Sequence, residues 1–134
     1  MPTILCIDDQ PVGLAIRKTL LETQGYEVVI AENGLDGISL ARKYNIDAVV
    51  LDYRMPGMCG DAIAEILKSE HPDLPIILLS GVPDLPSSVL APIDAYIVKG
   101  DGAVALLSTL EQLTTQRRKP SLPAAGSAAE QRTA

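Results

Sequence analysis

The sequence predicts an α/β fold: a doubly wound five-stranded parallel sheet with helices on both faces. Five short runs of aliphatic and β-branched residues alternate with longer stretches of helical periodicity, the pattern of repeated βαβ units. The runs are continuously apolar instead of alternating with polar residues, as expected for strands that helices cover on both faces. The expected strands are Thr3–Ile7, Glu27–Ile30, Ala48–Leu51, Ile76–Leu79 and Ala95–Val98.

Apolar spacing and capping residues indicate the helices between these strands. Pro11 suits the first turn of the first helix, and Gly25 suits the position after its end. Asn33 is a suitable N-cap for the second helix, because its side chain can accept a hydrogen bond from a free N–H of the first turn. Helices are therefore expected over Pro11–Gln24, from Asn33 through Lys43, from about Gly60 to Glu70, and from about Asp101 onward.

The connection between the last two strands is expected to hold only a turn or two of helix. Pro83, Pro86 and Pro92 lie within ten residues of one another there. Proline interrupts helices because it lacks an N–H and its ring clashes with the preceding turn. The fourth helix is therefore expected to be short or irregular, around Ser87–Leu90.

Composition and charge indicate one acidic globular domain with a tail. The chain has 134 residues, of which 47% are hydrophobic and 21% charged, enough for a single core. Residues 1–116 hold 7 Lys and Arg against 16 Asp and Glu, which argues against direct nucleic-acid binding through phosphates. We expect a domain at 1–115 and, at 116–134, a disordered tail rich in Ala, Pro and Ser, with no output domain.

Neither export nor a membrane anchor is indicated. The chain starts without a basic leader before its apolar run, and no stretch reaches the ~18 apolar residues of a membrane span. Cys6 and Cys59 are far apart and belong to no Cys-x-x-Cys or Cys/His cluster, so neither a disulfide framework nor a zinc site is indicated. A cytoplasmic protein with two free thiols is expected.

Polar residues follow four of the five expected strands, at the edge where open parallel sheets bind ligands. They are Asp8 and Asp9, then Asp52, Ser80 and Lys99. Three carboxylates at one edge repel one another unless a cation lies among them, and oxygen ligands of this kind suit Mg²⁺. A lysine and a serine there would contact a phosphoryl group. Each residue alone has an ordinary explanation as a turn, cap or surface residue, but together they indicate a phosphoryl site.

Over roughly residues 3–113 the sequence resembles the receiver domain of two-component response regulators. The motifs that carry the resemblance are ILCIDD, NGLDGISLARKYNIDAVVLDYRMPGMCG, IILLSG and AYIVKG. The resemblance implies a flavodoxin-like (CheY-like) strand order of 2-1-3-4-5. The implied roles are phosphoacceptor for Asp52, magnesium ligands for Asp8, Asp9, Asp52 and the main-chain carbonyl of Arg54, phosphoryl contacts for Ser80 and Lys99, and switch residues for Ser80 and Tyr96.

The resemblance also implies a place in a His-to-Asp phosphorelay instead of a role as a metabolic enzyme. The donor would be a sensor histidine kinase or a phosphotransfer protein, and the output an unidentified protein bound by a stand-alone monomer or weak homodimer. Two features depart from the family. Gly100 follows Lys99 where the family usually has proline, and the proline-rich segment 82–93 occupies the place of the fourth helix. The family uses the face around the fourth helix to bind partner proteins. The surface through which this protein signals to a partner is therefore expected to be unusual.

Two alternatives from other classes stay open. A phosphorylation-independent binding module with a receiver-like fold would be favoured if Asp52 were unreactive. A small α/β enzyme or nucleotide carrier is less well supported. Aspartate-nucleophile phosphatases have Asp-x-Asp after the nucleophile strand. Here the sequence is Asp52-Tyr53-Arg54, so arginine replaces the second aspartate of that motif. Flavin carriers have a donor-rich loop after the first strand, where Asp8 and Asp9 would instead repel a phosphate.

Overall fold

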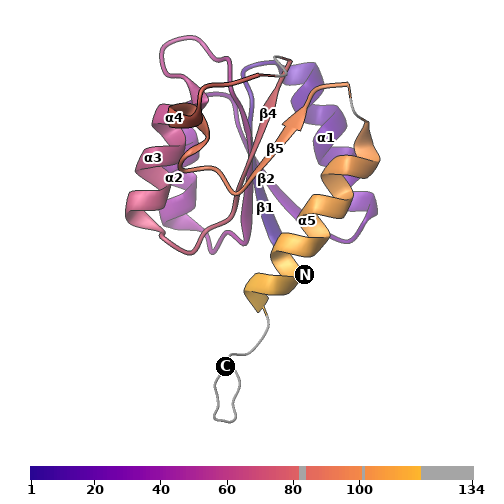
Figure 1. Cartoon of the computed structure of the whole chain (residues 1–134). Coiled ribbons are helices and arrows are strands. Elements are labelled where there is room, and N and C mark those ends of the chain that lie inside the picture. Colours follow the sequence, from indigo (N-terminus) through magenta and orange to yellow (C-terminus); the bar gives the residue numbers. More distant parts are fainter. Residues whose placement is uncertain (82–83, 101, 119–134) are drawn as a thin grey trace.

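In the computed structural model, the described residues, 1–81, 84–100 and 102–118, form a parallel sheet with helices on both faces (Figure 1). The five strands lie in the order β2-β1-β3-β4-β5, so the expected fold class and strand order are confirmed. The elements are β1 (Thr3–Ile7), α1 (Pro11–Thr23), β2 (Glu27–Ala31), α2 (Gly34–Lys43), β3 (Ala48–Asp52), α3 (Gly60–Glu70), β4 (Ile76–Ser80), α4 (Ser87–Leu90), β5 (Ala95–Val98) and α5 (Ala103–Arg118).

The sheet separates two hydrophobic cores, which explains why its strands are apolar on both faces. Helices α2, α3 and α4 cover one face, and α1 and α5 cover the other (Figure 1). Along β1, Leu5 and Ile7 belong to the first core, whereas Ile4 and Cys6 belong to the second. Successive side chains of a strand point to opposite faces, so a strand covered on both sides has few positions for polar residues.

Local signals place the helices as expected. The Asn33 side chain accepts a hydrogen bond from the main-chain N–H of Asp36 at 2.8 Å, so its role as N-cap of α2 is confirmed. Pro11 begins α1. The prolines of the fourth connection leave α4 with four residues, Ser87–Leu90, as expected. Helix α4 is therefore a single turn on the face of the sheet that α2 and α3 also cover.

Helix α5 continues past the expected domain boundary at residue 115, because it ends at Arg118. Residues 119–134, the rest of the expected tail, lie outside the described part of the chain, as do Val82, Pro83 and Asp101. In the part that is described, no helix combines the length and apolar character needed to cross a membrane.

Gly60, the first residue of α3, holds the loop after β3 close to the sheet. Its N–H donates to the carbonyl of Tyr53 at 2.8 Å. A Cβ atom at this position would lie 2.8 Å from the main-chain oxygen of Asp52 and 3.0 Å from the Cα of Tyr53. Both neighbours are backbone atoms and cannot move without shifting the strand end that carries Asp52.

Gly60→Ala is therefore expected to lower the free energy of unfolding by about 1–3 kcal/mol, the usual cost of forcing extra volume into a packed region. Urea denaturation would measure the change. Gly81→Ala is the matched control, because a Cβ there would meet nothing within 4 Å. Equal stabilities of the two variants would contradict the close contact at Gly60.

Candidate functional site

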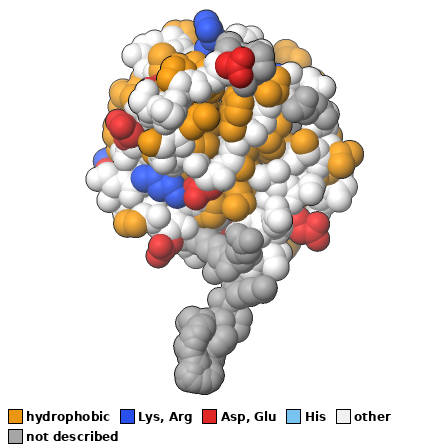
Figure 2. Space-filling model, viewed as in Figure 1, with side chains coloured by type: hydrophobic (Ala, Val, Ile, Leu, Met, Phe, Trp, Pro, Cys, Tyr) orange, Lys and Arg blue, Asp and Glu red, His pale blue; other side chains and the backbone are white. Residues whose placement is uncertain are grey.

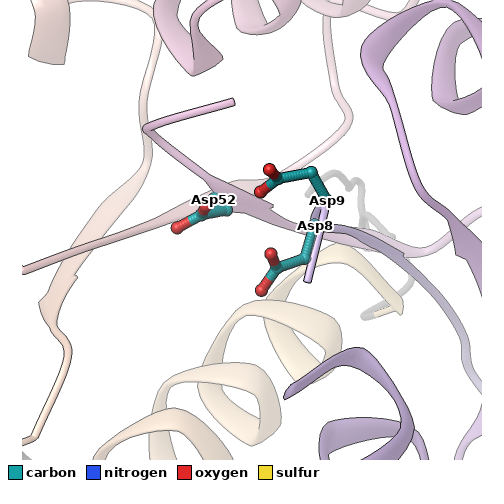
Figure 3. Close-up of side chains that lie close together, drawn as sticks. All are labelled: Asp8, Asp9 and Asp52. Carbon is teal, nitrogen blue, oxygen red and sulfur yellow. The ribbon is translucent and has the colours of Figure 1, made fainter. Parts of the chain in front are cut away.

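Three carboxylates meet at the carboxyl edge of the sheet. Asp52 is the last residue of β3, and Asp8 directly follows β1. The two strands are neighbours, with Ile7 paired to Leu51, so Asp8 comes to lie beside Asp52. Asp9 completes the group, and one oxygen from each carboxylate lies within 4.8 Å of the others (Figure 3). The three residues that the sequence pattern selected are thus brought together.

Asp8 and Asp52 are the two buried members of this group. Asp52 is 3% exposed and Asp8 is 1% exposed. Burial raises the pKa of the Asp52 carboxyl above its ordinary value, and the charges of Asp8 and Asp9 add to this effect, while the Lys99 ammonium opposes it. The site therefore favours a cation or a neutral group at Asp52 over an uncompensated carboxylate.

Lys99 reaches the same carboxylate from the end of β5. Its ammonium nitrogen lies 2.7 Å from Oδ1 of Asp52. The main-chain N–H of Lys99 also donates to the carbonyl of Ser80 at 2.7 Å, which fixes the residue against the end of β4. Ser80 itself is 2% exposed. Lys99 is therefore held beside the carboxylates, and Ser80 lies next to it at the end of β4.

Glycine after Lys99 does not prevent this arrangement. Gly100 and Gly102 have φ angles of 104° and 92°, in the left-handed region that glycine adopts without strain. The chain turns there from β5 toward α5. The site thus keeps Lys99 on Asp52 without the proline that is usual in the family.

Tyr96 and Arg54 are near Lys99 and Asp52 in the sequence, but the described contacts do not link their side chains to the three carboxylates. Tyr96 is half-buried in β5 and packs against the core on the α3 side. Its hydroxyl is enclosed and has no hydrogen-bond partner among the described residues. Arg54 is exposed in the loop after Asp52. The switch role of Tyr96 and the carbonyl ligand of Arg54 stay predictions.

Arg17 is a site residue that the sequence pattern did not single out. It lies in α1, and its Nη1 atom is 3.2 Å from Oδ2 of Asp8. Its side chain is 13% exposed, against 2% for that of Asp8, so this ion pair is shielded from solvent. The sequence carries no signal for it, because the contact depends on how α1 lies over β1. The carboxylate group therefore has two cationic neighbours, Lys99 and Arg17.

The donor set fits a hard divalent cation. Carboxylate oxygens are the ligands that Mg²⁺ prefers, and Mg²⁺ commonly uses one or two carboxylates with water and phosphate. Three carboxylates converge at this site, from the chain segments that end β1 and β3 (Figure 3). No sulfur or imidazole donor belongs to the group, so its chemistry favours Mg²⁺ over softer metals.

In metal-free buffer, Asp52→Asn is expected to raise the free energy of unfolding at pH 7. Because the pKa of Asp52 is raised in the fold, its ionised form costs stability above that pKa. The cost disappears as the pH falls from the raised value toward the ordinary value of about 3.9. Urea titrations with EDTA at pH 7 and about pH 4 should show the advantage of the asparagine variant shrinking in acid.

The exposed Asp73, replaced by asparagine, is the control for this comparison. The difference in stability between Asp52→Asn and this control should be larger at pH 7 than at about pH 4. An advantage of Asp52→Asn that stayed constant or grew in acid would contradict the raised pKa.

Known proteins resemble this chain in both sequence and fold. Residues 4–111 match the family model of the response regulator receiver domain. TcrX of Mycobacterium tuberculosis, a probable transcriptional regulatory protein, is 35% identical over 100 residues, which are 72% of this chain and 43% of TcrX. PilH of Pseudomonas aeruginosa is 38% identical over 60% of this chain and 68% of PilH. The chain therefore spans less than half the length of TcrX.

Solved structures extend the likeness to three dimensions. The response regulator TrrA of Thermotoga maritima, in complex with Mg²⁺ and beryllium fluoride, has a TM-score of 0.80 and 32% identity, covering 84% of this chain and 99% of TrrA. TrrA has also been solved in complex with the histidine kinase ThkA, with a TM-score of 0.78. A receiver domain protein of Methanospirillum hungatei has a TM-score of 0.82 and 28% identity, covering 87% of this chain and 96% of that protein.

Proposed function

Because the chain belongs to the response regulator receiver domain family, whose members are signalling phosphoacceptors and not catalytic enzymes, we propose that Asp52 accepts a phosphoryl group in a magnesium-dependent reaction. The observation that carries this proposal is the convergence of Asp8, Asp9 and Asp52 within 4.8 Å, with the Lys99 ammonium 2.7 Å from Asp52. Acidic residues of an ordinary surface turn would need neither the burial of Asp8 and Asp52 nor the ion pair of Asp52 with Lys99.

The proposed reaction uses the carboxylate of Asp52 as a nucleophile. One of its oxygens forms a bond to phosphorus while the bond from phosphorus to the donor breaks, and the donor keeps that electron pair. The product is an acyl phosphate, which water hydrolyses to end the signal. Lys99 offsets negative charge on the phosphoryl oxygens, and Ser80 donates its hydroxyl to one of them. When bound by Asp8, Asp9, Asp52 and the main-chain carbonyl of Arg54, Mg²⁺ adds further positive charge.

We place a histidine kinase or phosphotransfer protein as the phosphoryl donor, in the cytoplasm. The ThkA complex of TrrA supports this assignment, since it pairs a kinase with a relative of 32% identity. A small acyl phosphate is a second donor, because the chemistry at Asp52 needs only a phosphorus with a good leaving group. The domain would occupy residues 1–115, with the downstream protein bound by the same unit.

We place the output surface at the α4 and β5 edge. Hydrophobic side chains gather over this part of the molecule in Figure 2. Leu85, Leu90, Ile93 and Tyr96 are only partly buried there, packed against the core. Phosphorylation adds about −1.5 to −2 charges at pH 7. Ser80 would be drawn toward that charge, and the ring of Tyr96 would enter the space it leaves, biasing a two-state surface.

Amide exchange with and without beryllium fluoride tests this surface. Exchange in residues 84–98 should change on addition of the reagent with Mg²⁺. Residues 36–43 of α2, which packs on β1 and β2 at the opposite end of the sheet from β5, are the internal reference and should change less. Unchanged exchange around Tyr96, with Asp52 shown to be modified, would place the output elsewhere.

The proposed function itself is tested by incubation with Mg²⁺ and acetyl phosphate. Intact mass spectrometry should show the addition of one phosphoryl group, which hydroxylamine removes. Asp52→Asn should show none, since an amide cannot form the acyl phosphate. If the unmodified protein gains no adduct from acetyl phosphate or from a matched kinase, a phosphorylation-independent binding role replaces this proposal.

A further inference from the structure

Arg17 points to a control on metal binding that adds to the proposed function and rests on it. Both oxygens of Asp8 already have partners in the fold. Oδ1 accepts a hydrogen bond from the main-chain N–H of Gln10 at 3.0 Å, and Oδ2 lies 3.2 Å from Nη1 of Arg17. A cation that binds Asp8 must therefore share the carboxylate with the guanidinium of Arg17, whose side chain is 13% exposed.

The local structure of α1 allows Arg17 to reach Asp8. Side chains of a helix lean toward its N-terminus, so Arg17 extends over the turn that contains Gly13. A Cβ on Gly13 would lie 3.8 Å from Oδ2 of Asp8, the same oxygen that Arg17 contacts. A large side chain at position 13 would compete for that space.

Arg17 and Lys99 also share one pocket. A pocket of about 320 Å³ lies between α1 and the turn from β5 to α5, and both cations line it together with Gly13 and Gly100. Lys99 is paired with Asp52 and Arg17 with Asp8. The three carboxylates therefore face two fixed positive charges, which leaves one net negative charge to attract a divalent cation.

We infer that Arg17 is an internal counterion that competes with Mg²⁺ for Asp8 and thereby makes tight metal binding depend on the phosphoryl group. A guanidinium near the metal site opposes a second cation through charge repulsion. Phosphorylation replaces the Asp52 carboxylate by a group of about −1.5 to −2 charges, so the site then has enough negative charge for both cations. Arg17 acts through Asp8, as a positioning residue, and has no contact with the reacting atoms.

Calorimetric titration of Mg²⁺ into the metal-free protein tests this inference. Arg17→Met and Arg17→Gln should each bind Mg²⁺ at least about fivefold more tightly than the unmodified protein, a difference of about 1 kcal/mol. Arg17→Lys keeps the charge and should stay within about twofold of the unmodified protein. In the presence of beryllium fluoride, the two neutral variants should differ from it by less than about twofold, because the phosphoryl mimic supplies the missing negative charge.

Lys18→Met is the matched control, since it removes a neighbouring positive charge whose ion pair is with Glu22 at 2.7 Å instead of with the site. Its Mg²⁺ affinity should equal that of the unmodified protein. Unchanged affinity in both neutral Arg17 variants, or an equal gain in Lys18→Met, would overturn the inference. The proposed function fails separately, if the unmodified protein binds no Mg²⁺ and forms no adduct. Circular dichroism establishes that each variant is folded before titration.

Discussion

Replacing Lys99 by methionine is expected to slow phosphorylation by acetyl phosphate about 10²- to 10³-fold, the usual effect of removing one group that stabilises transition-state charge. The Lys99 ammonium lies 2.7 Å from Oδ1 of Asp52. It is therefore next to the carboxylate that forms the bond to phosphorus. Methionine keeps an unbranched apolar side chain of similar length but removes the charge. The rate of adduct formation by intact mass spectrometry measures the effect.

Lys68→Met is the control for this variant. Lys68 is also a lysine in an ion pair with an aspartate, 2.6 Å from Oδ2 of Asp94, but it belongs to α3 and is not part of the carboxylate group. Its rate should match that of the unmodified protein. A rate for Lys99→Met within about threefold of the unmodified rate would mean that Lys99 fixes the structure and contributes little to the reaction.

Removal of divalent cations by EDTA is expected to abolish adduct formation, with a fall in rate of at least about 10³-fold. Without the metal, Asp8, Asp9 and Asp52 hold negative charge within 4.8 Å of one another and would repel an incoming phosphoryl group. Excess Mg²⁺ added after EDTA should restore the rate. Asp9→Asn should require a higher Mg²⁺ concentration for the same rate, because one hard anionic ligand is lost.

An unaltered rate in EDTA would contradict the metal-dependent reaction. A rate that falls in EDTA but is not restored by Mg²⁺ would indicate that chelation damages the fold or removes another metal. Circular dichroism of the EDTA-treated protein distinguishes damage to the fold from the removal of another metal.

Much of the fold follows from the sequence because burial on both faces leaves a strong signal. Strands such as Ala48–Asp52 are apolar at nearly every position, and prolines limit α4 to Ser87–Leu90. Strand ends were harder to place. Asp52 and Ser80 are polar, yet each continues the main-chain pairing of its strand by one residue beyond the expected end. The N–H of Tyr53, for example, donates to the carbonyl of Leu79 at 2.9 Å.

Other features depend on contacts that a linear pattern does not carry. Helix α5 extends to Arg118, beyond the apolar pattern that indicates it in the sequence. The carboxylates Asp8 and Asp52 were predicted together, since parallel strands end at the same edge. The ion pair of Arg17 with Asp8 depends on how α1 lies over β1, and the sequence spacing alone does not determine that distance.

Asp52, among the acidic residues of the chain, is expected to form the acyl phosphate. Hydroxylamine converts an acyl phosphate into a hydroxamate, which marks the carboxyl that carried it. Trypsin cleavage after Lys43 and Arg54 releases residues 44–54, a peptide that holds Asp52 together with Asp47 as an internal control. After incubation with Mg²⁺ and acetyl phosphate, tandem mass spectrometry should place the hydroxamate on Asp52 and leave Asp47 unmodified. A hydroxamate on another carboxyl, with Asp52 unmodified, would contradict this account.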